Sequence, residues 1–169
     1  MRSRTAYLLY AVLALAVGVW LYTTWSGDRR RIERQLDRFR SLVEKEGEES
    51  ALAAANQARL VGELLTRDFS LHLEPYAPVL TDRRELTRVI LGYRTRASRI
   101  GLDFRDRELA LDESSRIGDM TLVAAISGTA DGQAYREGYR LRLRWVPEDG
   151  EWRIQRVDLL EVLERPGLF

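Results

Sequence analysis

Residues 139–154 read YRLRLRWVPEDGEWRI, and this stretch decides the fold class. Apolar residues occupy every second position up to Trp145, with arginines between them, which is the period of a β-strand that buries one face. Asp149 and Gly150 form a residue pair that favours a two-residue hairpin turn. Such a turn places Trp145 opposite Ile154, a pairing of aromatic and β-branched side chains that stabilises one sheet face. The stretch therefore predicts an antiparallel hairpin.

Further strands are predicted immediately before this hairpin. Residues 102–111 alternate between apolar and charged side chains, but the parity slips between Arg105 and Glu108, which predicts a β-bulge. Residues 120–130 form another predicted strand, and the Asp-Gly pair at 131–132 is a second hairpin signal. The carboxyl-terminal half is thus predicted to be an antiparallel meander.

The amino-terminal half has the helical period instead. Apolar residues recur three or four positions apart in residues 29–43, 51–65 and 82–93, with Ser50 and Thr81 as the predicted N-caps of the second and third helices. A short strand is predicted at residues 69–73, between those two helices. Helices followed by an antiparallel meander specify an α+β domain of two layers.

An uncharged run covers 21 positions at residues 5–25. At about 1.5 Å rise per residue, a helix of this length matches a hydrocarbon core roughly 30 Å thick. A cleaved signal peptide with a small-residue site at 14–16 is the alternative, but it would leave an apolar new terminus. The predicted organisation is a basic tail (1–4), a transmembrane helix (5–25), a juxtamembrane helix (26–46) and a globular domain (47–165).

Arginines lie on both sides of this run, so its orientation is less clearly indicated. Counting charges favours a cytoplasmic domain, whereas a short basic tail before an apolar segment is typical of an uncleaved export signal. We expect a single-pass protein of the bacterial inner membrane with its domain in the periplasm. Arg29, Arg30 and Arg31 follow the run directly and are candidates for contact with anionic headgroups.

Composition excludes several kinds of site. The chain has no cysteine and one histidine, His72, so thiolate chemistry, disulfides and multi-histidine metal sites are excluded, and we expect no metal or cofactor. With 27 basic and 26 acidic residues, the net charge is +1, and no polycationic field recruits nucleic acid.

The order of the elements resembles the nuclear transport factor 2-like superfamily, also called the SnoaL-like or cystatin-like cone. The resemblance covers about residues 30 to 165 and is carried by TDRREL at 81–86, the bulged meander and the pattern at 139–154. It implies a curved antiparallel sheet that wraps about three helices and forms a pocket at its wide end. Members of this superfamily act as isomerases or cyclases, as dimerisation modules, and as membrane-tethered subunits of secretion and transport machines.

We expect a non-catalytic binding or scaffold domain that holds a partner protein or a small apolar ligand near the bilayer. One alternative is a subunit of a secretion or lipid-transport complex of the cell envelope, and another is an isomerase or hydrolase that acts on an apolar small molecule. The predicted pocket-lining residues are Phe104, Met120, Tyr139, Leu141, Leu143, Trp145, Trp152 and Ile154.

The arginines between the apolar residues of the predicted hairpin are candidates for contact with a protein partner. Arg140, Arg142 and Arg144 share one strand face and would suit an acidic partner or lipid phosphates. The alternative is a solvated sheet face on which Gln155 or Glu151 offsets the charge. A homodimer through the sheet is also expected, with Val123 and Ala125 at its contact.

The enzyme alternative needs a carboxylate and a phenol inside an apolar pocket, as in ketosteroid isomerases. The candidate residues are Tyr76, Tyr93, Tyr135, Tyr139, Asp103 and Asp106, although both aspartates alternate with apolar residues and are predicted to face water. His72 could act as a general base, but a solvated strand histidine is the simpler interpretation. A carboxylate and a tyrosine that converge would favour chemistry over simple binding.

Overall fold

The computed structural model describes residues 27–76, 78–112 and 116–164. A helix over residues 27–43, here called the first helix, comes before all other described elements. They are β1 (Lys45–Glu46), α2 (Ala51–Glu63), β2 (Leu65–His72), α3 (Arg83–Arg96), β3 (Ala97–Asp112), β4 (Ile117–Ala130), β5 (Gln133–Glu148) and β6 (Glu151–Glu164). The predicted transmembrane run at residues 5–25 lies outside this description. Among the residues described, no helix is long and apolar enough to cross a bilayer.

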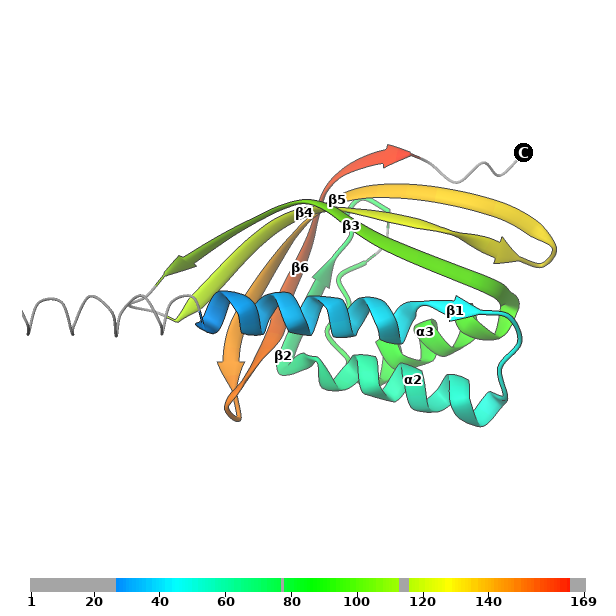
Figure 1. The fold of residues 1–169 in the computed structure, drawn as a ribbon, viewed down its shortest axis with the longest axis horizontal. Coiled ribbons are helices and arrows are strands. Elements are labelled where there is room, and N and C mark those ends of the chain that lie inside the picture. The colour runs from blue at the N-terminus through cyan, green and yellow to red at the C-terminus, as the bar shows by residue number, and fades with distance from the viewer. Residues whose placement is uncertain (1–26, 77, 113–115, 165–169) are drawn as a thin grey trace, which may run out of the picture.

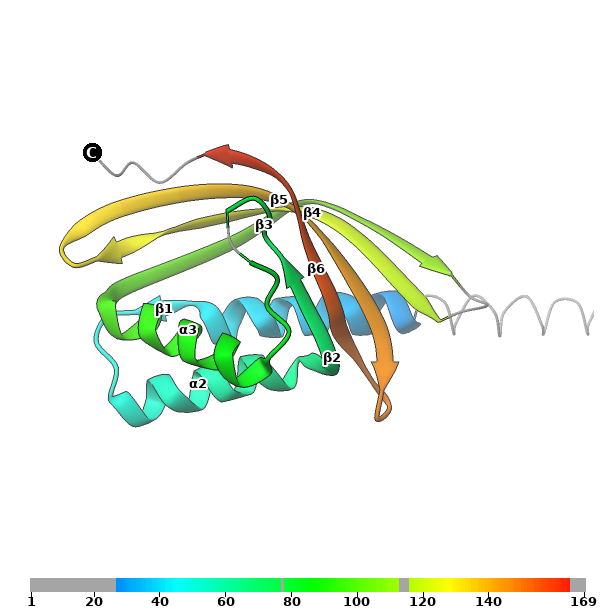
Figure 2. The same cartoon turned by 180° about the vertical axis from the view of Figure 1, so that it is seen from behind.

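The strands form a single curled sheet in the order β1-β3-β4-β5-β6-β2. The first helix, α2 and α3 all lie on its concave side (Figures 1 and 2). The β5–β6 turn and the start of the first helix lie at one end of the molecule, whereas the β4–β5 hairpin lies at the other. The prediction of an α+β fold with a curved sheet over about three helices is confirmed.

Both predicted hairpins and the predicted bulge are present. Trp145 pairs with Ile154 as expected, and the turn residues Asp149 and Gly150 have φ angles of 54° and 82°. Positive φ at both central positions is what this type of tight turn requires. The Asp-Gly pair at 131–132 has the same geometry, and the register of β3 against β4 shifts between Arg105 and Glu108.

One predicted N-cap is confirmed and the other is wrong by one residue. Ser50 caps α2, and its hydroxyl oxygen accepts from the Ala53 N–H at 3.2 Å. The cap of α3 is Asp82 rather than Thr81, and its carboxylate accepts from the Arg84 N–H at 2.7 Å. A carboxylate both accepts this bond and interacts favourably with the positive end of the helix dipole.

The predicted apolar stripe of α3 is wrong at one position. The Val89 side chain is 59% exposed, whereas Leu86 and Ile90 pack against the two apolar clusters. Apolar residues spaced three and four positions apart form a stripe along the helix. This stripe is wider than the face of α3 that α2 and the sheet cover, so one of its residues is left exposed.

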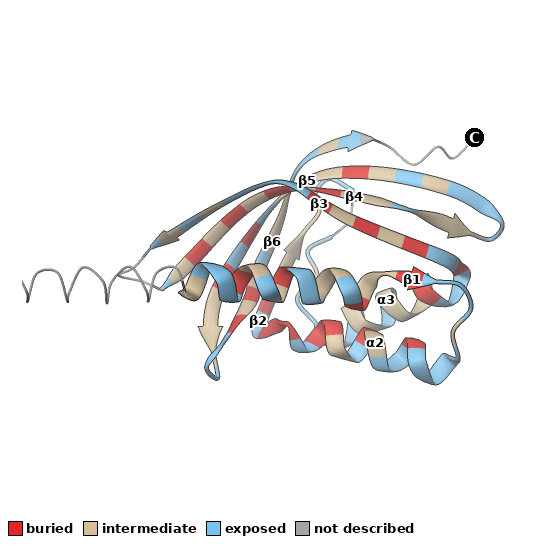
Figure 3. Ribbon diagram, viewed as in Figure 1, coloured by how far each residue is buried: buried red, intermediate tan, exposed pale blue. Residues whose placement is uncertain are grey.

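The first helix is part of the core. Ile32 and Leu36 are fully buried among the inner side chains of the sheet, where each contributes roughly 1.5–3 kcal/mol. A methyl group added at Gly118 would lie 3.0 Å from the Ile32 Cδ1 atom, so the helix packs directly on β4. Buried positions alternate along the strands that face this helix (Figure 3).

The edge strand β2 differs from the antiparallel meander that the sequence predicts. It runs from Leu65 to His72, longer than expected, and pairs in parallel with β6, with Leu71 opposite Val157. The partner strand follows about 80 residues later in the chain, so no local pattern in residues 65–72 indicates this pairing.

Candidate functional site

One face of β5 lines the concave side of the sheet along its whole length. β4 and β5 pair without a register shift, so the alternation of β5 is unbroken from its first residues to Trp145. Every second side chain therefore points inward. The inward-facing positions are Tyr135, Glu137, Tyr139, Leu141, Leu143 and Trp145.

The inner face of the sheet has a closed half, where the side chains are buried, and a half-buried part, where they are partly exposed. On β5, Leu143 and Trp145 are buried against the first helix, whereas the inward-facing side chains at 135, 137, 139 and 141 are half-buried. Six of the eight predicted pocket residues belong to the closed half, and only Tyr139 and Leu141 lie in the other. The six buried residues are Phe104, Met120, Leu143, Trp145, Trp152 and Ile154. Their role in lining a pocket stays a prediction.

The half-buried part contains a group of phenols around one carboxylate, here called the tyrosine cluster: Tyr93, Tyr135, Glu137 and Tyr139. The Tyr139 hydroxyl donates to Oε2 of Glu137 at 2.7 Å. Tyr93, from α3, meets Tyr135 edge to face, with ring centroids 5.9 Å apart and planes inclined at 74°. The cluster thus joins α3 to the inner face of β5.

The phenols of the cluster are held neutral. Burial raises the pKa of Tyr93 well above its usual range, and the neighbouring Tyr135 hydroxyl adds to this effect. Burial also raises the pKa of Tyr139, and its hydrogen bond to Glu137 raises it further. The pKa of Tyr135 is raised mainly by burial as well. At neutral pH each of the three phenols therefore keeps its single O–H donor, and the donor of Tyr139 is taken up by Glu137.

The Tyr135 hydroxyl is buried close to the Tyr93 hydroxyl, but it makes no hydrogen bond of good geometry with the residues that the structure describes. It lies over Gly128, its partner on β4, where a Cβ atom would come 2.5 Å from the phenol oxygen and would clash with the Arg99 carbonyl oxygen. Only glycine leaves room for the ring at this position. A buried hydroxyl without a partner costs about 1–3 kcal/mol, which a bound oxygen or nitrogen atom could recover.

The aspartates predicted to face water do so. Asp103 pairs with Arg105 at 2.7 Å on the outer side of β3, and this hydrogen bond lowers the pKa of Asp103. Asp106 is exposed at the bulge, where its φ angle is 50°, and Tyr76 is 61% exposed. His72 is half-buried at the end of β2.

The carboxylate that converges with tyrosines is Glu137, which the sequence analysis did not single out. The alternation from Tyr139 back through Glu137 to Tyr135 was sufficient to place it on the inner face. It was missed because an acidic residue near a hairpin tip is usually solvated.

The outer sheet face carries a row of arginines from β5, here called the arginine ladder: Arg140, Arg142 and Arg144. Two of its members are paired. Arg140 contacts Glu161 at 3.0 Å, and Arg144 holds Asp119 through two nitrogens at 3.0 and 3.2 Å. The suggested partners Gln155 and Glu151 do not lie opposite these arginines. A register shift places Arg156 rather than Gln155 opposite Arg144, and Glu151 pairs with Glu148 beside the turn. Gln155 instead donates to Asp68 at 2.8 Å.

Arg29, Arg30 and Arg31 lie exposed near the start of the first helix. Arg29 is 3.5 Å from Glu33, and Arg31 is 3.5 Å from Asp28. Elsewhere in the described part of the chain, no group of three His, Cys, Asp or Glu side chains is placed to hold a metal ion.

No protein-family model matches the sequence, and no curated protein matches it. Solved structures, in contrast, resemble the fold. A putative scytalone dehydratase from Novosphingobium aromaticivorans superimposes with a TM-score of 0.67 at 14% identity, over 85% of this chain and 89% of that one. An NTF2-like protein with a cystatin-like fold, from the same organism, gives 0.66 at 12% identity over 86% and 90%.

A third similar structure is a putative calcium/calmodulin dependent protein kinase II association domain from Xanthomonas campestris. Its TM-score is 0.60 at 15% identity, over 77% of this chain and 84% of that chain. At such low identities the comparisons show the fold alone. The fold is thus similar to that of NTF2-like cone proteins, and its inner face carries a half-buried tyrosine cluster.

Proposed function

We propose that this domain binds a small, mainly apolar molecule that carries a carbonyl or hydroxyl oxygen, and that the tyrosine cluster receives that oxygen. The observation that supports the proposal is the buried Tyr135 hydroxyl, which makes no hydrogen bond of good geometry within the described part of the chain. The Tyr139–Glu137 hydrogen bond lies on the same inner face. A phenol O–H that makes no hydrogen bond can donate to a ligand oxygen, once the ligand displaces the side chains that cover it. Half-buried apolar residues of the same inner face, such as Ile126 and Leu141, would contact the remainder of the ligand.

The similar structures are compatible with this proposal without deciding it. One is a putative scytalone dehydratase and another a putative aromatic ring hydroxylase, whereas a third is a putative association domain. One fold carries such different functions because they depend on sites rather than on the scaffold.

The proposal includes a tether. Residues 5–25 would anchor the chain in the bacterial inner membrane, with the domain outside the cytoplasm, because their uncharged length suits a bilayer. A protein partner, or a place in a secretion or lipid-transport complex, would then contact the outer sheet face. Arg142 is the member of the ladder with no ion-pair partner among the described residues, so it is the candidate contact.

The second candidate function is proton transfer on a carbonyl compound. The observation in its favour is that Glu137 and two phenols converge on one inner face. Glu137 would remove a proton next to the carbonyl group, while Tyr135 would donate a hydrogen bond to the carbonyl oxygen.

Binding is tested with two matched fluorescent probes, 2-naphthol and naphthalene, which differ by one hydroxyl group. The full chain in detergent should bind 2-naphthol more tightly than naphthalene. Tyr135→Phe should weaken 2-naphthol binding about tenfold, because one hydrogen bond contributes about 1–1.5 kcal/mol. Naphthalene binding should stay unchanged. The free energy of unfolding should be equal or higher in the variant, because a buried hydroxyl that makes no hydrogen bond to the described residues is removed.

Tyr76→Phe is the matched control, because that tyrosine is exposed. Equal affinity of the wild type for both probes would contradict the proposal, and so would an unchanged 2-naphthol affinity in Tyr135→Phe. The second candidate is tested by deuterium uptake into 2-tetralone in D₂O, which Glu137→Gln should abolish if the carboxylate is the base.

A further inference from the structure

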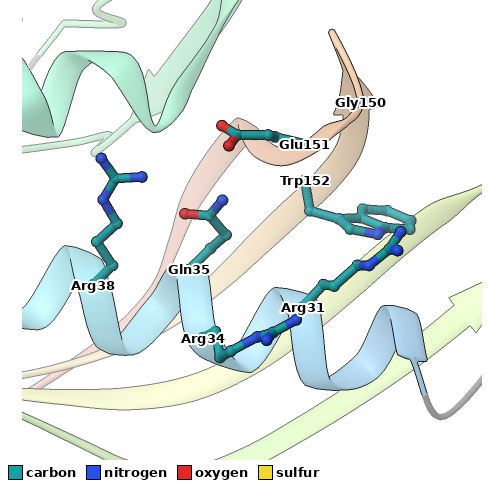
Figure 4. A pocket seen from close by; sticks show the side chains of 7 residues that line it. All are labelled: Arg31, Arg34, Gln35, Arg38, Gly150, Glu151 and Trp152. Carbon is teal, nitrogen blue, oxygen red and sulfur yellow. The ribbon is translucent and has the colours of Figure 1, made fainter.

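A second site lies far from the tyrosine cluster, at the end of the molecule where the first helix begins. An open groove of about 400 Å³ separates this helix from the β5–β6 turn. We call it the basic groove, and Figure 4 shows its lining residues: Arg31, Arg34, Gln35, Arg38, Gly150, Glu151 and Trp152. It goes beyond the proposed function, because none of these residues belongs to the tyrosine cluster.

The helix side of the groove is cationic. Arg34 and Arg38 are exposed and have no ion-pair partner among the described residues. Arg31 shares Asp28 with Trp152, whose indole N–H donates to the Asp28 Oδ1 atom at 3.1 Å. Two guanidinium groups thus project along one groove without an acidic partner, an arrangement that suits phosphate oxygens.

The opposite side supplies complementary chemistry. Glu151, on the turn, is exposed and faces the groove across from the helix (Figure 4). On the helix side, the Gln35 side-chain oxygen is buried without a hydrogen-bond partner among the described residues, so an unsatisfied acceptor lies beside the arginines. A ligand that combines a phosphate with hydroxyl donors would satisfy both sides.

A second groove on the other flank of the same helix is a weaker candidate. It is lined by Gly27, Arg30, Arg31, Glu33, Arg34 and Asp37, so two carboxylates offset its arginines. In the basic groove, three arginines face one glutamate. The basic groove therefore attracts an anion more strongly.

The position of the groove indicates the source of the phosphate. The uncharged run at residues 5–25 ends only six residues before Arg31 and nine before Arg34. We propose that the basic groove binds the headgroup of an anionic phospholipid with a hydroxyl-bearing phosphodiester, and so fixes the domain against the bilayer surface. The inference shares with the proposed function only the expectation that residues 5–25 enter the membrane.

The detergent-solubilised full chain is titrated with three probes, and binding is measured by native mass spectrometry. The probes are phosphatidylglycerol, phosphatidylcholine and glycerol 3-phosphate. The wild type should prefer phosphatidylglycerol to both others. The double variant Arg34→Gln/Arg38→Gln should bind it about 30-fold more weakly, from about 1 kcal/mol for each arginine near an anionic surface. Arg34→Lys/Arg38→Lys should recover most of the affinity, because the charge is retained.

Arg84→Gln/Arg88→Gln is the matched control, a pair of exposed arginines four residues apart on α3. An unchanged affinity in the Arg34/Arg38 glutamine variant, or an equal loss in the control, would overturn the inference. Glycerol 3-phosphate binding as tightly as phosphatidylglycerol would also overturn it, in favour of a soluble phosphate ester. Since Tyr135→Phe leaves the groove intact, failure here is distinguishable from failure of the proposed function.

Discussion

The guanidinium group of Arg94 and the carboxylate of Glu49 form a two-point ion pair, with both nitrogen–oxygen distances at 2.9 Å. The same guanidinium donates to the Leu42 and Val43 carbonyl oxygens at the end of the first helix. Lys45 lies beside the pair and donates to the carbonyl oxygens of Arg94 and Ala97. These contacts join the first helix, the loop before α2 and the end of α3.

Removal of one charge from this pair should destabilise the domain. Arg94 is 3% exposed, so Arg94→Met leaves two helix-end carbonyl groups without their partner. Glu49 then keeps only the more distant Lys45 Nζ atom, 4.0 Å away. We expect a loss of about 3–5 kcal/mol in the free energy of unfolding, measured by urea denaturation. Arg59→Met breaks an exposed pair with Glu63 and should cost less than about 1 kcal/mol. Similar losses in both variants would show that the buried pair is not the cause.

Gly128 should tolerate no side chain. Gly128→Ala places a methyl group against the Arg99 carbonyl oxygen and the Tyr135 phenol, and backbone atoms of a paired strand have little room to move. The expected loss is about 1–3 kcal/mol. Gly92→Ala, at an open position in α3, should be neutral or stabilising by up to about 1 kcal/mol. Chemical denaturation of the two variants compares them directly, and equal stability would contradict the close approach.

Stability should fall at alkaline pH, in part through Tyr93. Burial raises its pKa in the folded state above the unfolded value of about 10. Between these two pKa values the folded state holds more protons than the unfolded state. The contribution of Tyr93 to stability is therefore fully present below about pH 10 and is lost as the pH rises further. The slope of the urea midpoint against pH should be shallower in Tyr93→Phe. Tyr76→Phe should keep the wild-type slope, and an unaltered slope in Tyr93→Phe would refute the assignment.

The outer sheet face is the expected contact of a homodimer. Val123 and Ala125 are half-buried there, and Val123 pairs with Arg105 and Arg140 on the neighbouring strands. Val123→Glu should fold normally, because two arginines flank the new carboxylate, yet it should separate the dimer by adding charge to its contact. Sedimentation velocity of the full chain in detergent measures this change. A variant that sediments like the wild type would exclude this face as the contact.

The sequence correctly predicts those structural features that depend on only a few neighbouring residues. The Asp-Gly pairs fix both hairpins, because these residues adopt positive φ at low cost, and alternation then sets which side chains share a face. The parity slip before Glu108 located the bulge for the same reason. The cap of α3 was misplaced because Thr81 and Asp82 are both good caps, and only the geometry distinguishes them.

The candidate site was only partly predictable. Tyr139 and Leu141 were expected near a ligand, but most of the other pocket residues proved to pack against the first helix. Periodicity shows which face is apolar, and it does not show which part of that face another element covers. Glu137 is a candidate because the tertiary structure places Tyr93 of α3 against Tyr135 of β5, on the same inner face as the Tyr139–Glu137 hydrogen bond.

By itself, the amino-acid sequence determined the helices, the hairpins, the bulge and the inner face of the sheet, because these depend on backbone preferences and side-chain periodicity over a few residues. Only the tertiary structure decided that β2 pairs in parallel with β6, that Arg94 binds Glu49, and that Tyr135 lies buried over Gly128. Two of these three join residues at least 45 positions apart, and bulges alter the register between strands. Such partners are chosen by packing in space, which no local pattern contains.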